Sequence, residues 1–261
     1  MDLMKKSILS VFSIMLIIAA VMPQQTYAQH IKNLSWSIVK LDSTWNACGE
    51  SVTGKIIAKY KPTIDPLMEV IGYTDYELDK LSEKHSLANL STDILLDCAQ
   101  KYLAKKGLNT HLDIALTNYG GIRTTIPAGN ITSFDVLSVF PFDNRLVIFN
   151  LEGKYVRELM ENFAKRGRVE AMAGVEMVVA KNQLEKCLIG GLPLDDAKIY
   201  RIATIDFLLS GGDSVYALKY GTDVIETGII VRDAVIDYIK EQTRNGKEVI
   251  AAPEIRVIIK K

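Results

Sequence analysis

Three loop clusters in the sequence carry side chains that could bind a planar ligand with an anionic group. The first cluster follows the apolar run Ile114–Leu116 and contains Asn118, the pair Gly120 and Gly121, and Arg123. Paired glycines after a strand let the backbone approach a ligand closely, while asparagine and arginine supply hydrogen bonds and a fixed positive charge. This pattern predicts a ligand-facing loop. The alternative is that the two glycines only reverse the chain.

The other two clusters each place an aromatic ring beside polar residues. Phe142 and Asn144 lie in the segment Pro141–Asn144, at the predicted tip between a helix and a strand. Phe207 precedes a Gly-Gly turn that ends at Asp213. The alternatives are that Phe142 fills the core and that Asp213 only caps a helix or closes a turn.

Taken together, these residue types suit a nucleobase with an attached sugar and phosphate. Two aromatic rings can stack on a base, which contributes about 1 to 3 kcal/mol per base. An aspartate can accept hydrogen bonds from sugar hydroxyls, and an arginine can bind phosphate through a forked contact. The sequence offers no nucleophile elbow, no cysteine–histidine signature and no metal-ligand motif. It therefore predicts binding without a catalytic or metal site in this chain.

Composition argues against a nucleic acid or an anionic membrane surface as the partner. Lys plus Arg and Asp plus Glu both number 31, so any anion site must be local. The three histidines, His30, His85 and His111, are scattered without metal-ligand spacing. The three cysteines, Cys48, Cys98 and Cys187, leave at least one thiol unpaired, and whether two of them pair stays open.

The N-terminus has the pattern of an export signal. Lys5 and Lys6 precede an apolar run from Ile8 to Val21, and cleavage is expected after Ala28. A retained signal anchor is the alternative. We therefore expect residues 1–28 to be a signal peptide, residues 29–70 an N-terminal extension or linker, and residues 71–261 the folded domain of a periplasmic or secreted protein.

Hydrophobic periodicity predicts one mixed α/β domain that positions the three loops. Residues 29–62 contain short apolar runs, interpreted as strands, such as Trp36–Val39 and Lys55–Ala58. The predicted helices are Asn89–Lys106, a short one capped by Ser133, Gly153–Lys165 and Gly228–Gln242. The predicted strands are Ile114–Leu116, Leu146–Phe149, Val175–Val179, Tyr200–Ile205 and Ile255–Ile259. Because Leu146–Phe149 is apolar at consecutive positions, we expect it to be buried on both faces.

The order and spacing of these motifs resemble the C-terminal domain of the 5′-nucleotidase family, which includes ecto-5′-nucleotidase and bacterial periplasmic UDP-sugar hydrolase. The resemblance covers most of the predicted mature chain. The matching segments are Ile71–Gly72, Leu87–Leu90, Thr117–Arg123, Pro141–Asn144 and Ser210–Asp213.

The resemblance implies a mixed-sheet, layered α/β/β/α fold and a role for each loop residue. Phe142 and Phe207 would stack on the base, and Asn144 would contact its edge. The remaining implied contacts are Asp213 to the ribose hydroxyls, Arg123 to the phosphate, and Asn118 with Gly120 and Gly121 as the loop that shapes the nucleoside pocket.

Two departures from the family pattern matter. Some family members have an additional phosphate-binding arginine in the segment that corresponds to Ser82–Asn89, and this sequence has none there. Lys84 or His85 is the only basic residue that could replace it. Whether the chain prefers a nucleotide or a nucleoside therefore stays open. Residues 29–70 contain none of the metal-ligand motifs of the family's metallophosphoesterase domain.

We therefore expect the nucleotide-recognition chain of a split 5′-nucleotidase, a phosphoric monoester hydrolase by resemblance. A separately encoded metallophosphoesterase would supply the divalent metal ions. The alternatives are a stand-alone periplasmic nucleoside- or nucleotide-binding protein and an interaction module that has lost ligand binding. The sequence leaves the base preference, the partner's identity and the oligomeric state open.

Overall fold

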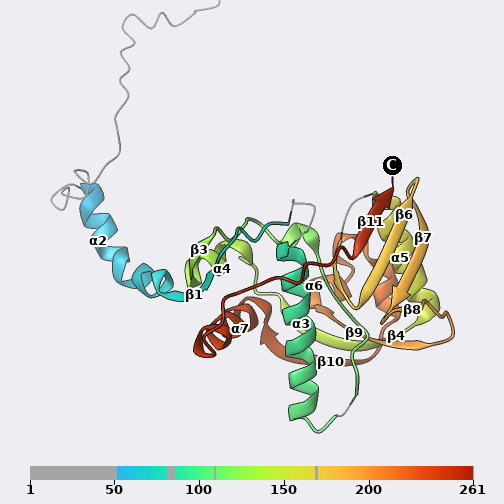
Figure 1. The fold of residues 1–261 in the computed structure, drawn as a ribbon. Coiled ribbons are helices and arrows are strands. Elements are labelled where there is room, and N and C mark those ends of the chain that lie inside the picture. The colour runs from blue at the N-terminus through green and yellow to red at the C-terminus, as the bar shows by residue number, and fades with distance from the viewer. Residues whose placement is uncertain (1–51, 81–85, 109, 168–169, 261) are drawn as a thin grey trace, which may run out of the picture. The chain divides into compact units, whose positions relative to one another are not determined.

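The computed structural model describes residues 52–80, 86–108, 110–167 and 170–260 (Figure 1). From Val52 onward the chain forms one compact unit. The predicted signal peptide, the predicted strand Trp36–Val39, and Cys48, Lys84 and His85 lie outside the described residues. Among the helices that are described, none is long and apolar enough to cross a membrane.

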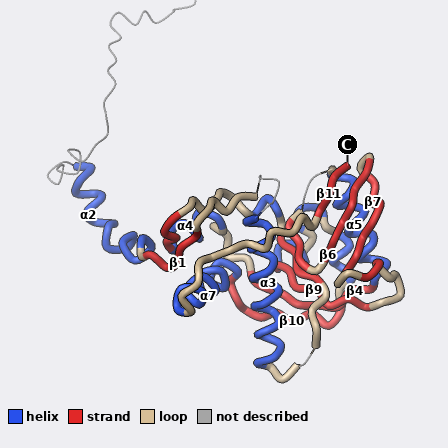
Figure 2. Tube along the Cα trace, in the orientation of Figure 1, coloured by secondary structure: helices blue, strands red, loops and turns tan. Residues whose placement is uncertain are grey.

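A five-stranded mixed sheet forms the centre of this unit (Figure 2). Its strands are, in spatial order, β10 (Thr222–Ile230), β4 (Arg145–Glu152), β9 (Ile199–Ile205), β2 (Ile114–Thr117) and β5 (Ala171–Ala173). In this sheet β2 and β9 are parallel, and the other neighbours are antiparallel. The four consecutive apolar residues Leu146–Phe149 of β4 are all buried, which confirms that this strand is covered on both faces.

Two long helices contact the central sheet. Helix α3 (Ser86–Lys105) contacts β2, β5 and β9, while α5 (Gly153–Arg166) contacts β4 and β9. Helix α5 also contacts a second sheet, in the order β11 (Val257–Lys260), β6 (Val175–Ala180), β7 (Gln183–Ile189) and β8 (Leu192–Pro193). One apolar core joins both sheets and both helices. The expectation of a mixed α/β fold is thereby confirmed.

A smaller apolar core lies around the antiparallel pair β1 (Val70–Thr74) and β3 (Gly129–Thr132), together with α4 (Ser133–Val139) and α7 (Val231–Arg244). The prediction that Ser133 caps α4 is wrong by one residue. Thr132 is the N-cap, and it forms a capping box with Asp135 in which each side chain bonds the other residue's backbone N–H. The predicted helix start at Gly228 is also early, because β10 continues to Ile230.

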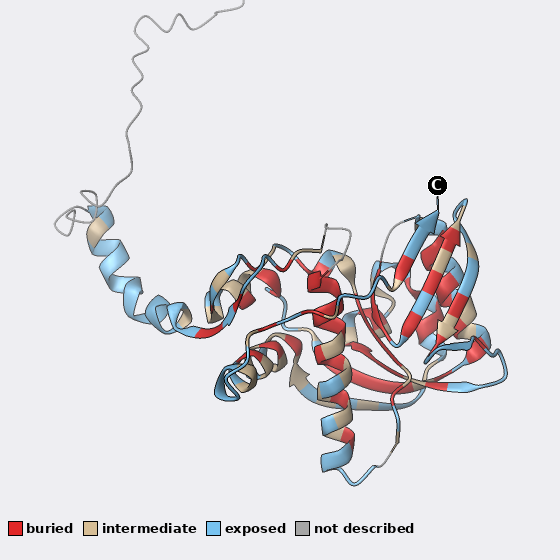
Figure 3. Cartoon of the chain, viewed as in Figure 1, coloured by how far each residue is buried: buried red, intermediate tan, exposed pale blue. Residues whose placement is uncertain are grey.

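The strand predicted at Lys55–Ala58 is wrong, because this segment lies inside helix α2 (Val52–Ile64), which the 3₁₀ helix η2 (Asp65–Met68) follows. A four-residue apolar run does not distinguish strand from helix, whereas Val52, Ile56 and Tyr60 recur at the helical spacing of four. None of the residues of α2 is buried against the rest of the described chain, and the helix is almost wholly exposed in Figure 3.

Candidate functional site

The three loop clusters meet at one edge of the central sheet because of its strand directions. Strands β2 and β9 are parallel, so their last residues lie at the same edge. Strand β4 is antiparallel to β9, with Leu146 opposite Ile205, so its first residues lie there too. Asn118 follows β2, Phe142 precedes β4 and Phe207 follows β9. Segments that are far apart in the sequence are thus brought together by the sheet.

A small pocket at this edge contains four of the residues predicted for the site: Asn118, Gly121, Phe142 and Asn144. Its remaining walls are Thr117, Phe140, Ile205 and Val231. The backbone N–H of Val231 donates to the carbonyl oxygen of Asn144 at 2.9 Å, which joins the start of α7 to the tip loop. Gly120, Arg123, Phe207 and Asp213 do not line this pocket.

The Asn118 loop is a single 3₁₀ turn, η3 (Tyr119–Gly121). The N–H of Gly121 donates to the carbonyl oxygen of Asn118 at 2.9 Å. A Cβ added to Gly121 would lie 2.2 Å from Asn118 Oδ1, whereas a Cβ on Gly120 would meet nothing within 4 Å. Only the second glycine of the pair is therefore required for close packing, and it makes room for the asparagine side chain.

Asn118 Oδ1 is buried and accepts no hydrogen bond from the described residues. Buried polar atoms are nearly always paired, so an acceptor of this kind at a pocket wall is available to a donor on a ligand.

Arg123 is exposed beside the same loop. Its Nη1 donates to the carbonyl oxygen of Gly120 at 3.1 Å, which uses one of the five guanidinium N–H donors. Sequence reasoning missed a second positive group here: Lys80 Nζ donates to the carbonyl oxygens of Tyr119, at 3.3 Å, and Ile122. Lys80 lies 39 residues before Tyr119 in the sequence, and no local pattern connects the two.

Both predicted stacking rings are partly exposed. Phe142 retains 48% of its accessible surface and Phe207 retains 42%. The alternative that Phe142 fills the core is therefore wrong. Phe207 lies in the short helix α6 (Asp206–Leu209), and its ring packs on Gly212, where an added Cβ would come within 2.5 Å of it.

Asp213 is an exposed residue of the 3₁₀ turn η4 (Gly212–Ser214), which follows α6. Its backbone is in the left-handed region, with φ of 51°, which aspartate tolerates better than most residues. Its carbonyl oxygen accepts a hydrogen bond of 2.7 Å from Arg166 Nη2, and Arg166 also pairs with the buried Glu170 at 3.0 Å. This geometry fits both a ligand contact and the alternative role as a turn residue.

Within the described parts of the chain, no three or more histidine, cysteine, aspartate or glutamate side chains are grouped as a metal site would require. The site is thus built from aromatic rings, amides, an exposed carboxylate and basic side chains.

The family model described as the 5′-nucleotidase C-terminal domain matches residues 70–220. This match covers more than half of the chain, and the chain therefore belongs to that family, as the resemblance implied. Protein UshA of Escherichia coli K12 is 34% identical over 145 residues, which are 54% of this chain and 26% of that protein. A 5′-nucleotidase of Vibrio cholerae is 31% identical over 132 residues, which are 49% of this chain and 24% of that protein.

Solved structures agree with the assignment. The 5′-nucleotidase precursor of Thermus thermophilus superposes with a TM-score of 0.67 at 28% identity, covering 79% of this chain and 42% of that one. The NAD nucleotidase of Haemophilus influenzae, at 20% identity and a TM-score of 0.58, covers 80% of this chain and 41% of that one, and it shares the fold. The chain spans about a quarter of the length of the curated relatives that it matches.

Proposed function

We propose that this chain recognises the nucleotide substrate of a 5′-nucleotidase. The observation that supports this proposal is that the half-exposed Phe142 lines one pocket with Asn118 and Asn144. The half-exposed Phe207 follows β9 at the same edge of the central sheet. Exposed aromatic rings are costly in water and offer faces on which a base can stack. The base would lie between the two rings, with Asn144 at its edge.

The sugar and the phosphate would extend from the base toward the charged residues. The exposed carboxylate of Asp213 would accept hydrogen bonds from the ribose hydroxyls. Arg123 would bind the phosphate through the N–H donors that its contact with Gly120 leaves available. Lys80, which is held beside the same loop, adds to the positive potential there.

Hydrolysis of the phosphate ester would require a metallophosphoesterase, which we assign to a separately encoded chain. Divalent metal ions in that chain would polarise the phosphate and lower the pKa of a bound water molecule, so that hydroxide attacks at neutral pH. The export pattern of residues 1–28 supports a periplasmic or secreted location, in which the two chains would meet.

Reconstitution tests this function. The full chain is first titrated with AMP and adenosine by calorimetry. It is then mixed with Mn²⁺ and a separately purified metallophosphoesterase chain from the same genome. Phosphate release from AMP should require both chains and the metal, and the Phe142→Ala/Phe207→Ala double variant should not support it.

Ligand binding and phosphate release together distinguish a split 5′-nucleotidase from a stand-alone binding protein. Binding of AMP or adenosine without phosphate release in the mixture would favour a stand-alone nucleoside- or nucleotide-binding protein. Absence of both binding and release would contradict nucleotide recognition altogether.

A further inference from the structure

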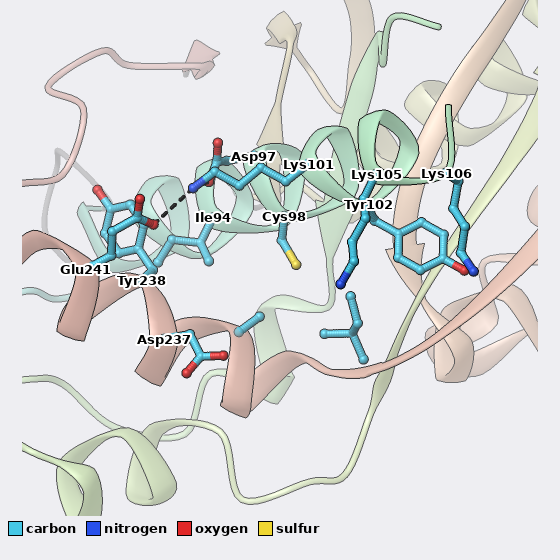
Figure 4. A pocket seen from close by; sticks show the side chains of 12 residues that line it. Ile94, Asp97, Cys98, Lys101, Tyr102, Lys105, Lys106, Asp237, Tyr238 and Glu241 are labelled. Atoms are coloured by element: carbon cyan, nitrogen blue, oxygen red, sulfur yellow. Dashed lines mark hydrogen bonds and ion pairs between the residues drawn. The ribbon is translucent and has the colours of Figure 1, made fainter. Parts of the chain in front are cut away.

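A cavity much larger than the nucleotide pocket lies elsewhere in the described part of the chain. A groove of about 480 Å³ lies between helices α3 and α7 (Figure 4). Pockets that bind small organic ligands have volumes of about 300 to 1,000 Å³. The groove is therefore large enough for a ligand of that size, and nothing in the nucleotide-recognition role uses it.

The floor of this groove is apolar. Ile94 and Cys98 from α3 line it on one side, and Ile229 and Ala234 from the end of β10 and the start of α7 line it on the other. Burial raises the pKa of the Cys98 thiol, so the side chain is a neutral, weakly polar contact at physiological pH. The floor suits the apolar body of a ligand.

The acidic residues of the groove lie at one end, and its two lysines without ion pairs to described residues lie at the other. At one end, Lys101 is held by Asp97, at 2.9 Å, and by Glu241, at 3.0 Å, and Asp237 lies on the same side (Figure 4). Tyr238 lies there too, and its pKa is raised first by burial and then by Asp93 and Asp97. This end therefore repels an anion.

The opposite end of the groove is basic. Lys105 and Lys106, in the last turn of α3 and just after it, line the groove and form no ion pair with any of the described residues. Lys106 Nζ lies 5.6 Å from the centre of the Tyr102 ring. Both lysines lie at the C-terminal end of α3, where basic side chains interact favourably with the helix dipole. An anionic head is expected at this end alone.

We propose that the groove between α3 and α7 is a second ligand site, which takes a small organic anion with an apolar body. The body would lie on Ile94, Cys98 and Ala234, and the single anionic head would face Lys105 and Lys106. The site is distinct from the nucleotide pocket, with which it shares no lining residue. The assignment does not depend on nucleotide recognition.

A fluorescence titration with 1-anilinonaphthalene-8-sulfonate tests this site, because the probe has an aromatic body and one anionic group. The full chain should show a saturable increase in fluorescence. Ala234→Leu fills the floor, and leucine is a good helix former, so the variant should fold and bind the probe at least about tenfold more weakly. Lys105→Gln/Lys106→Gln should weaken binding about three- to fivefold, since exposed charge contacts are modest.

The matched control is Lys240→Gln, which removes a charge from an exposed position of α7 outside the groove and should bind the probe like the native chain. Circular dichroism and thermal midpoints show whether each variant is folded. A folded Ala234→Leu variant that binds the probe as tightly as the native chain would overturn the assignment. So would displacement of the probe by adenosine, because the probe would then occupy the nucleotide pocket.

Alkylation of the native chain provides a second readout that needs no variant. A saturating concentration of the probe should slow the reaction of Cys98 with iodoacetamide and leave that of the buried Cys187 unchanged, as followed by mass spectrometry of the two peptides. Unchanged alkylation of Cys98 would place the probe elsewhere and refute the site.

Discussion

The carboxylate of Asp206 ties the two ring-bearing loops together through the backbone of Arg145. The N–H of Arg145 donates to Asp206 Oδ1 at 3.0 Å, and the N–H of Phe207 donates to the same oxygen at 2.8 Å. Arg145 begins β4, shortly after Phe142 in the chain. Asp206 Oδ1 therefore holds two backbone groups in place: that of Arg145, which follows the Phe142 loop, and that of Phe207 itself.

Replacing Asp206 should disturb the spacing of the rings without removing a ligand contact. Asp206→Ala leaves two backbone donors without their acceptor, so we expect the free energy of unfolding to fall by about 1 to 2 kcal/mol and adenosine to bind about tenfold more weakly. Asp206→Asn keeps an acceptor oxygen, so its stability and its affinity for adenosine should fall much less. Thermal denaturation and calorimetry measure the two effects, and an Asp206→Ala variant with native adenosine affinity would show that the rings are positioned by other contacts.

The two adjacent glycines of the Asn118 loop should respond differently to alanine. Gly121→Ala would place a Cβ 2.2 Å from Asn118 Oδ1 and force that side chain to move, so adenosine should bind at least about tenfold more weakly. Gly120→Ala meets nothing within 4 Å and serves as the matched control, with affinity close to that of the native chain. Equal affinities of the two variants would mean that the position of Asn118 does not affect binding.

Arg123 should distinguish nucleotide from nucleoside. A charge-assisted hydrogen bond contributes about 1.5 to 3 kcal/mol, so Arg123→Gln should weaken AMP binding by about ten- to a hundredfold and leave adenosine binding nearly unchanged. Arg123→Lys keeps the charge but loses the forked geometry, and should give an intermediate AMP affinity. If Arg123→Gln weakened AMP and adenosine binding equally, the residue would act on the loop and not on the phosphate.

The buried thiol of Cys187 should make stability depend on pH in the alkaline range. Burial raises its pKa from the ordinary 9.0 to about 11, although Arg157 acts in the opposite direction. The unfolded chain loses this proton near pH 9 while the native protein keeps it to about pH 11, so the thiol's contribution lowers the free energy of unfolding across that interval. Denaturant unfolding should be measured at about pH 8 and about pH 10. Between these two pH values the free energy of unfolding should fall less for Cys187→Ala than for the native chain. An equal fall in both proteins would show that the Cys187 thiol does not cause the pH dependence.

Long segments with a clear hydrophobic period could be predicted from the sequence. The predicted helix Asn89–Lys106 corresponds to α3 to within three residues at each end, because a long run at helical spacing leaves little ambiguity. The predicted strand Leu146–Phe149 is correct in type but covers only the fully apolar part of the longer strand β4. The short strands β5 and β8 and the four-residue helix α6 were missed, since so few residues carry no usable period. The boundary predicted between residues 70 and 71 stays a prediction.

Site residues could be predicted from the sequence only where they lie in loops with a distinctive composition, such as polar or glycine-rich turns. Asn118, Gly121, Phe142 and Asn144 were found because a polar or glycine-rich turn interrupts apolar segments. Ile205 and Val231 were not, because each is an ordinary apolar residue at the end of an element. Their place in the pocket follows from the pairing of strands far apart in the sequence, and Lys80 was missed for the same reason.

Nucleotide recognition by this chain depends most directly on Phe142 and Phe207 being ligand contacts. A calorimetric titration with adenosine tests this in the native chain and in Phe142→Ala, Phe207→Ala and Phe134→Ala. Phe134 is the matched control, because it is 43% exposed in α4 and does not line the pocket. We predict that each of the first two variants loses about 1 to 3 kcal/mol of binding free energy and that Phe134→Ala loses none. Adenosine binding that is the same in all four proteins, or absent from the native chain, would contradict nucleotide recognition at this site.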